Sequence, residues 1–144
     1  MNILKDILYN VALVSVQGST DVHINAIHYD SRKINKNDVF VAIKGTQFDG
    51  HSFINRAIEN GASVIVAETL PQTKSNNITY IEVESSSSAL AYMSANFYQH
   101  PSKNLKLIGI TGTNGKTTVA TLLFNLFTAA GYKVGLISTW RMYL

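Results

Sequence analysis

Apolar residues recur along the chain in two spacings, and each spacing predicts a different kind of element. Intervals of three and four residues predict helices, whereas short runs of β-branched residues predict strands. The predicted helices lie within residues 3–8, 49–61, 85–100 and 119–131. The predicted strands lie within residues 22–31, 38–45, 63–68, 78–83, 105–111 and 133–139. Because strands alternate with helices, we expect an α/β fold with a largely parallel sheet.

Cap residues mark the ends of several predicted helices. Asp49 is an expected N-cap, and the serine run Ser85–Ser88 offers hydroxyl groups to the free N–H groups of the next helix. Gly61 and Gly131 are expected C-caps, and Pro101 is expected to stop the third helix.

We expect two domains, formed by residues 1–103 and 104–144, with the boundary inside the segment His100–Asn104. A complete α/β unit precedes this segment, and a strand–turn–helix–strand unit follows it. The second unit is too short to bury both faces of a sheet. We therefore expect the chain to be part of a larger protein, and its open sheet edge to favour self-association.

Composition and charge narrow the function classes. Hydrophobic residues make up 46% of the 144 residues and charged residues 15%, as in an ordinary packed domain. The net charge of +3 favours anionic ligands, but the basic residues form no run, so a nucleic-acid surface is not expected. No apolar run is long enough to span a bilayer. The absence of cysteine excludes thiolate metal sites and suits the reducing cytoplasm, where we expect this protein.

The segment 105–131 combines an apolar run, a glycine-rich turn and an amphipathic helix. Such a turn directs backbone N–H groups at an anion, and the helix dipole adds partial positive charge. Gly112 and Gly115 would let the backbone approach a phosphate closely. Lys116 would reach the terminal phosphates, and the hydroxyl of Thr117 would bind Mg²⁺.

This turn departs from the usual P-loop pattern. Ile110 occupies the position where that pattern has its first glycine. The alternative interpretation is an ordinary tight turn between a strand and a helix, with an exposed lysine.

The segment "GITGTNGKTT", residues 109–118, resembles the ATP-binding loop of the Mur ligases, which share this variant spacing. The same loop is similar to that of folylpolyglutamate synthases. Residues 30–66 resemble the substrate domain of the MurE branch and, less closely, that of the MurF branch. The resemblance implies an N-terminal α/β UDP-binding domain, followed by the first strand–P-loop–helix–strand of a P-loop ATPase-like central domain.

The resemblance also implies an activity. A Mur ligase of this branch uses ATP and Mg²⁺ to add the third stem-peptide residue, meso-diaminopimelate or L-lysine, to UDP-MurNAc-L-Ala-D-Glu through an acyl phosphate. The expected partners are this UDP-MurNAc-dipeptide and an amino acid, without nucleic acid or membrane. The full-length protein is expected to be a monomer, and this chain alone is expected to be inactive.

Site residues follow from the same motifs. The resemblance implies that Tyr29, Ser31, Arg32, Thr46, Gln47 and Phe48 contact the UDP-sugar substrate. It implies that Gly112, Thr113, Asn114, Gly115, Lys116, Thr117 and Thr118 bind ATP, with Lys116 catalytic and Thr117 a metal ligand. The alternative for Asp30 and Arg32 is a plain turn, in which Asp30 caps backbone N–H groups and Arg32 is solvated.

Two other functions stay open at this point. One is a ligase of the MurF or folylpolyglutamate type. The other is a nucleotide-binding module without catalytic activity, which uses the glycine turn for regulation or assembly.

Overall fold

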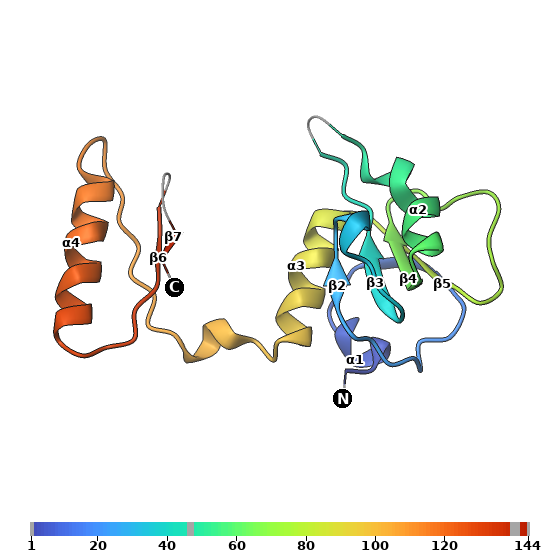
Figure 1. Ribbon diagram of the computed structural model, residues 1–144, viewed down its shortest axis with the longest axis horizontal. Coiled ribbons are helices and arrows are strands. Elements are labelled where there is room, and N and C mark those ends of the chain that lie inside the picture. The colour runs from blue at the N-terminus through green and yellow to red at the C-terminus, as the bar shows by residue number, and fades with distance from the viewer. Residues whose placement is uncertain (1, 46–47, 139–141, 144) are drawn as a thin grey trace. The chain divides into compact units, whose positions relative to one another are not determined.

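The computed structural model describes residues 2–45, 48–138 and 142–143. The chain divides into two compact units, Met1–Asn104 and Leu105–Leu144, and each is described by itself (Figure 1). Within the described residues, no helix has the length and apolar character needed to cross a membrane.

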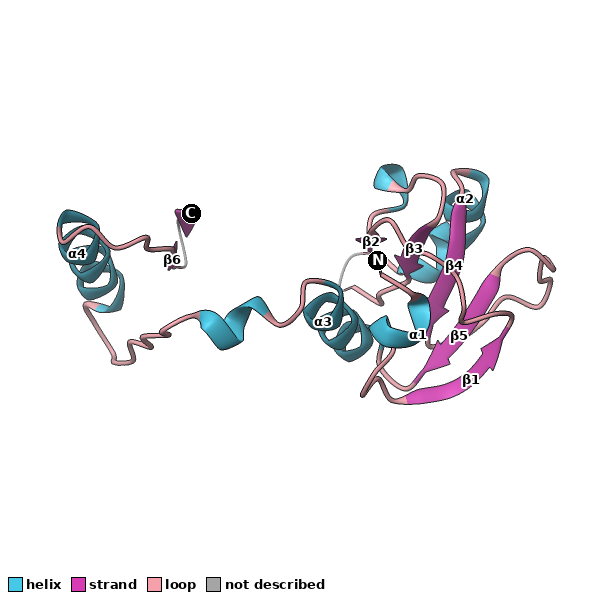
Figure 2. Cartoon of the chain, turned by 90° about the horizontal axis from the view of Figure 1, so that it is seen from below, coloured by secondary structure: helices cyan, strands magenta, loops and turns pink. Residues whose placement is uncertain are grey.

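The first unit is built on a five-stranded sheet, in which neighbouring strands lie side by side (Figure 2). In spatial order the strands are β1 (Leu13–Gln17), β5 (Thr79–Val83), β4 (Ala62–Ala67), β3 (Asp38–Val41) and β2 (Ile27–His28). The four strands β2 to β5 run parallel, and β1 pairs with β5 in the antiparallel direction. The predicted α/β fold with a largely parallel sheet is therefore confirmed.

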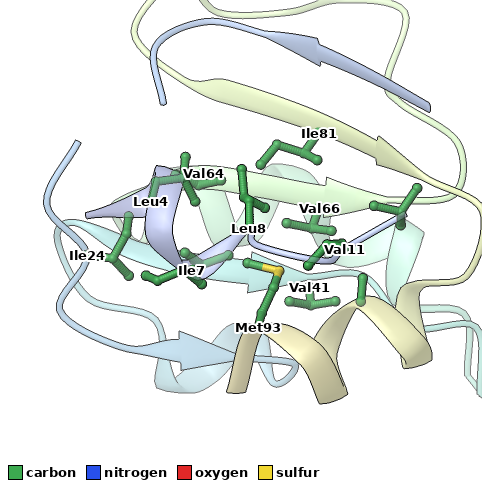
Figure 3. Close-up of a cluster of buried hydrophobic side chains, with 13 residues drawn as sticks. Leu4, Ile7, Leu8, Val11, Ile24, Val41, Val64, Val66, Ile81 and Met93 are labelled. Atoms are coloured by element: carbon green, nitrogen blue, oxygen red, sulfur yellow. The ribbon is translucent and has the colours of Figure 1, made fainter. Parts of the chain in front are cut away.

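Helices cover both faces of this sheet because successive strand residues point to opposite sides. One cluster joins Val64 and Val66 to helices α1 (Leu4–Ile7) and α3 (Ser86–Phe97). Figure 3 shows Met93 pointing from its helix into this cluster. On the other face Ile65 packs with residues of α2 (Ile54–Glu59), which continues the 3₁₀ helix η2 (Gly50–Phe53). Two further 3₁₀ helices are η1 (Ser31–Lys33) and η3 (Pro101–Asn104).

Two strands of the first unit differ from expectation. The strand predicted over residues 22–31 is reduced to β2, because it forms ladder contacts only where β3 lies alongside. Strand β1 was not predicted, although residues 14–17 alternate between apolar and polar, because this alternating run is only four residues long. Leu13, Val14 and Val16 are all substantially exposed at the edge of the sheet.

The second unit contains helix α4 (Lys116–Ala129) and the antiparallel pair β6 (Leu136–Ile137) and β7 (Met142–Tyr143) (Figure 1). The strand predicted over residues 105–111 is not formed, and this prediction was wrong. A parallel strand exists only when a neighbouring strand supplies its hydrogen bonds, and none of the described strands pairs with this segment. The strand predicted over residues 133–139 is shortened to β6, and Thr139 lies outside the described residues.

Candidate functional site: a glycine loop and the carboxyl edge of the sheet

The glycine loop of the second unit leads directly into α4. Gly112 has a φ angle of 151° and Gly115 has a φ angle of 77°, and residues with a Cβ rarely adopt such values. Gly115 is the N-cap of α4 and has no side-chain cap hydrogen bond. None of the backbone N–H groups from Gly112 to Thr118 donates to another part of the chain that the structure describes. These amides are therefore available to an anion at the positive end of the helix dipole.

Lys116 lies over this loop. Its Nζ donates to the carbonyl oxygen of Gly112 at 2.5 Å and to that of Thr113 at 3.4 Å. These contacts hold the ammonium group beside the free amides, where it adds a full positive charge to the partial charge of the helix end. A Cβ placed on Gly115 would meet no atom within 4 Å, so the space next to the amides is open.

Mg²⁺ fits this loop in one respect. The hydroxyl of Thr117, in the first turn of α4, supplies one hard oxygen ligand, and Mg²⁺ bound to nucleotides usually keeps waters and phosphate oxygens as its other ligands. Within the described residues there is no cluster of three or more histidine or acidic side chains that could hold a metal by itself.

In the first unit, the predicted substrate residues follow the parallel strands at their carboxyl ends. Tyr29, Ser31 and Arg32 come after β2, and Phe48 lies in the loop after β3. Parallel strands end at the same edge of a sheet, and this edge is where open α/β sheets bind ligands. The sheet topology thus brings these two loops to one edge.

The turn after β2 is held by an exposed ion pair. Asp30 Oδ1 accepts from the backbone N–H of Arg32 at 3.0 Å, and Asp30 is the N-cap of η1. The Arg32 guanidinium also donates from Nε to Oδ1 at 2.9 Å and from Nη2 to Oδ2 at 2.8 Å. The side-chain and backbone hydrogen bonds from Arg32 hold the pKa of Asp30 far below its usual range.

The other predicted substrate residues differ in exposure. Tyr29 is 68% exposed and Phe48 is 72% exposed, so both rings are open to a ligand. Ser31 is buried, and its carbonyl oxygen accepts from the side-chain amide of Asn60 at 2.8 Å. Thr46 and Gln47 lie outside the described residues.

A cleft of about 530 Å³ opens at the same edge of the sheet. It is lined by Lys44, Asp49, His51, Ser52, Ile54, Asn55, Glu68, Thr69, Leu70 and Pro71. The predicted N-cap role of Asp49 is confirmed, because its carboxylate accepts from the backbone N–H of His51 at 2.9 Å. The hydrogen bonds from His51 also lower the pKa of Asp49.

Sequence reasoning missed the His51 side chain. Its Nδ1 lies 2.6 Å from Asp49 Oδ1, and its Nε2 faces the backbone N–H groups of Glu68 at 3.2 Å and Thr69 at 3.3 Å. The spacing of an aspartate two residues before a histidine was a signal for the first contact. Nothing local in the sequence indicated the contact with the end of β4, since those residues are 17 and 18 positions away.

Glu68 extends this arrangement to α3. Its Oε1 accepts from the backbone N–H of Ser86 at 2.9 Å and from the Ser86 hydroxyl at 3.0 Å. These two hydrogen bonds lower the pKa of the Glu68 carboxyl. The predicted role of the serine run is confirmed, because Ser85 is the N-cap of α3 and accepts from the N–H of Ser88.

Sequence comparison with known proteins supports a relationship to the Mur ligases. A family model described as "Mur ligase family, catalytic domain" matches residues 23–98, more than half of the chain. The chain is 51% identical over 137 residues to the UDP-N-acetylmuramoyl-L-alanyl-D-glutamate–2,6-diaminopimelate ligase of Cytophaga hutchinsonii, covering 94% of this chain and 28% of that protein. It is 47% identical over 141 residues to the corresponding ligase 1 of Clostridium acetobutylicum, covering 98% and 29%. The chain thus spans less than a third of the length of these relatives.

Solved structures show the same fold. The MurF ligase of Thermotoga maritima in complex with ADP matches with a TM-score of 0.54 and 36% identity, over 73% of this chain and 23% of that one. A UDP-N-acetylmuramoyl-L-alanyl-D-glutamate–2,6-diaminopimelate ligase structure matches with a TM-score of 0.62 over 83% of this chain and 24% of that one. The second match has 23% sequence identity and supports the fold alone.

Proposed function

This chain belongs to the Mur ligase family, and we propose that it forms the UDP-sugar-binding part and the start of the ATP-binding part of an amide ligase. The complete enzyme would join diaminopimelate to UDP-N-acetylmuramoyl-L-alanyl-D-glutamate, the reaction named for relatives that match nearly the whole chain. We propose a cytoplasmic location for it, where nucleotide-linked precursors and ATP are both present.

Residues 1–103 would bind the UDP-linked substrate in this proposal. The exposed rings of Tyr29 and Phe48 can stack on uracil, and the Ser31 backbone lies in the same turn as Arg32. Arg32 uses Nε and Nη2 on Asp30, which leaves Nη1 to pair with a diphosphate oxygen. The Asp30 pair fixes the direction of the guanidinium before the substrate arrives.

Residues 104–144 would begin the P-loop ATPase-like domain. The free amides from Gly112 to Thr118 would surround the phosphates of ATP, and Lys116 would place its charge on the transferring γ-phosphoryl group. Thr117 would be one Mg²⁺ ligand, and the ion when bound would neutralise further phosphate charge. Lys116 and the bound ion would both act by stabilising negative charge, because phosphoryl transfer to a carboxylate needs no covalent bond to the protein.

The proposed chemistry has two steps. The D-glutamate carboxylate takes the γ-phosphoryl group and releases ADP, which gives an acyl phosphate. The amine of diaminopimelate then attacks the acyl carbon, and the tetrahedral intermediate loses phosphate as the peptide bond forms. No nucleophilic side chain of the enzyme is required in either step.

The observation that carries this proposal is the 51% identity over 94% of the chain, which includes both the loops after β2 and β3 and the glycine loop. Calorimetric titration of the 144-residue chain with UDP-N-acetylmuramoyl-L-alanyl-D-glutamate tests it. We expect saturable binding of this ligand, and no ADP release when ATP, Mg²⁺ and diaminopimelate are added. Absence of UDP-ligand binding would contradict the substrate assignment, and sustained ADP release would contradict the inactivity of the isolated chain.

A second candidate is a ligase of the MurF type, favoured by the 36% identity to the Thermotoga maritima structure. Titration with UDP-N-acetylmuramoylalanyl-D-glutamyl-2,6-diaminopimelate separates the two. Tighter binding of this longer ligand would favour the MurF type. A regulatory nucleotide module would bind ATP and ignore both UDP ligands.

A further inference from the structure

The protonation state of the His51 imidazole follows from its neighbours. Its Nε2 faces two backbone N–H groups, those of Glu68 and Thr69, and two donors require an acceptor between them. The ring proton therefore lies on Nδ1, which donates to Asp49 Oδ1. His51 is thus a neutral imidazole that donates on one side and accepts on the other. Its side chain is only 18% exposed, so water does not replace these partners readily.

The donor side of His51 holds one arm of a tight hairpin after β3. Lys44 and Asp49 form an isolated antiparallel bridge, the Gly50 N–H donates to the Ile43 carbonyl at 2.8 Å, and the Gly45 N–H donates to the Phe48 carbonyl at 3.0 Å. The two arms lie so close that a Cβ on Gly50 would come within 2.6 Å of the Ile43 backbone. This hairpin carries Phe48, a predicted substrate residue.

The acceptor side of His51 fixes the hairpin to the rest of the sheet edge. The amides of Glu68 and Thr69 directly follow β4, and the Glu68 carboxylate in turn binds the first residue of α3, Ser86. A continuous set of hydrogen bonds thus runs from the hairpin through His51 to β4 and α3. Among the described residues of this set, the His51 ring is the only side chain that links the hairpin to the end of β4.

We propose that neutral His51 is a positioning residue for the UDP-sugar site, holding the two described arms of the hairpin, residues 43–45 and 48–50, in the orientation that presents Phe48 to the substrate. The inference rests on the proposed function, because it needs a UDP-linked ligand at this edge of the sheet. His51 itself need not touch the ligand.

Two substitutions separate the two sides of the ring. In His51→Asn, the side-chain amide can still donate to Asp49 but is too short to reach the amides after β4. In His51→Gln, the longer side chain can accept from those amides but no longer presents a fixed donor to Asp49. His23→Asn is the matched control, because His23 is an exposed histidine elsewhere in the same unit.

The readout is the dissociation constant of UDP-N-acetylmuramoyl-L-alanyl-D-glutamate, measured for the 144-residue chain at neutral pH. Each His51 variant should bind about tenfold more weakly than wild type, the effect of losing one or two hydrogen bonds. His23→Asn should bind as tightly as wild type.

The outcomes separate the two proposals. His51 variants that are folded by circular dichroism yet keep wild-type affinity would overturn the positioning role alone. An equal loss of affinity in His23→Asn would do the same. A wild-type chain that does not bind the UDP ligand would overturn the proposed function and this inference together.

Discussion

The two units of this chain contain similar strand and helix patterns but bury them to very different degrees. In the first unit Val64, Ile65 and Val66 of β4 are 0% exposed, with packed side chains on both faces. In the second unit Leu107 is 93% exposed and Leu122 of α4 is 62% exposed. An apolar pattern therefore predicts which element can form, whereas neighbouring elements decide whether it is paired and buried.

The same contrast applies to the two long helices. Helix α3 buries Ala89 and Met93 against the sheet, whereas α4 has no buried residue. Most helical stability in proteins comes from packing of an apolar face. The glycine loop is thus shaped mainly by local features, the left-handed Gly115 and the Lys116 hydrogen bonds, and the carboxyl edge of the sheet in the first unit is shaped by its core.

The largest expected effect is a difference in stability between matched core and surface truncations. Ile65→Ala removes three carbons from a fully buried site and should lower the free energy of unfolding by about 2–5 kcal/mol. Leu122→Ala removes the same number of carbons from an exposed helix face and should change it by less than about 0.5 kcal/mol. Urea unfolding followed by circular dichroism measures both. Equal losses would show that α4 is packed in solution.

The next largest effect is expected on ATP binding, without a change in the stability of the first unit. Lys116→Ala should weaken ATP binding by about tenfold to a hundredfold, because a charged donor beside the phosphates is lost. The urea midpoint of the first unit should not move. Lys133→Ala removes the same charge from an exposed position of the same unit and is the control. Equal weakening in both variants would mean that Lys116 acts only through net charge.

Much of the first unit could be predicted because its strands have strong local signals. The runs around Val39–Val41 and Val64–Val66 are rich in β-branched residues and buried on both faces, and such runs are typical of parallel strands. Strand β1 was missed because its alternating run, residues 14–17, is short, and its apolar residues lie exposed at the edge of the sheet. The strand predicted over residues 105–111 was wrong for the opposite reason. Its apolar pattern is strong, but no described strand pairs with it.

Some parts of the candidate site could likewise be predicted from the sequence, and others could not. The glycine loop could be predicted because the residues that shape it, Gly112 to Lys116, are adjacent in sequence. The His51 contacts with Glu68 and Thr69 could not, because they depend on how the hairpin after β3 meets the end of β4. The turn at Asp30 was open to two interpretations, and the ion pair with Arg32 is compatible with both, since it leaves Nη1 for a ligand.

A smaller effect is expected at the start of α3. Ser85→Ala removes the side-chain acceptor for the Ser88 N–H and should lower the free energy of unfolding by about 1 kcal/mol. Ser87→Ala, in the exposed first turn of the same helix, is the control and should have almost no effect. Urea unfolding of both variants provides the comparison, and an equally small loss in Ser85→Ala would mean that Glu68 alone is sufficient to cap the helix.

The smallest expected effect is a pH dependence that originates at Glu68. Hydrogen bonds from Ser86 hold the pKa of its carboxyl below the ordinary value of 4.5. A group with a lowered folded-state pKa adds stability above its unfolded-state pKa and loses it as the pH falls through the folded-state pKa. Glu68→Gln keeps an acceptor for Ser86 but removes the titration, so its melting temperature should lie slightly below wild type at neutral pH.

This difference should shrink as the pH falls below about 4.5, the ordinary value, and through the lower pKa of the folded wild-type carboxyl. Asp30 and Asp49 also have lowered pKa values and destabilise both proteins in acid, so only the difference between wild type and Glu68→Gln isolates this group. Melting curves of both proteins at several pH values measure it. A constant difference at every pH would mean that Glu68 stabilises α3 through packing and neutral hydrogen bonds, and that its charge contributes nothing to the start of that helix.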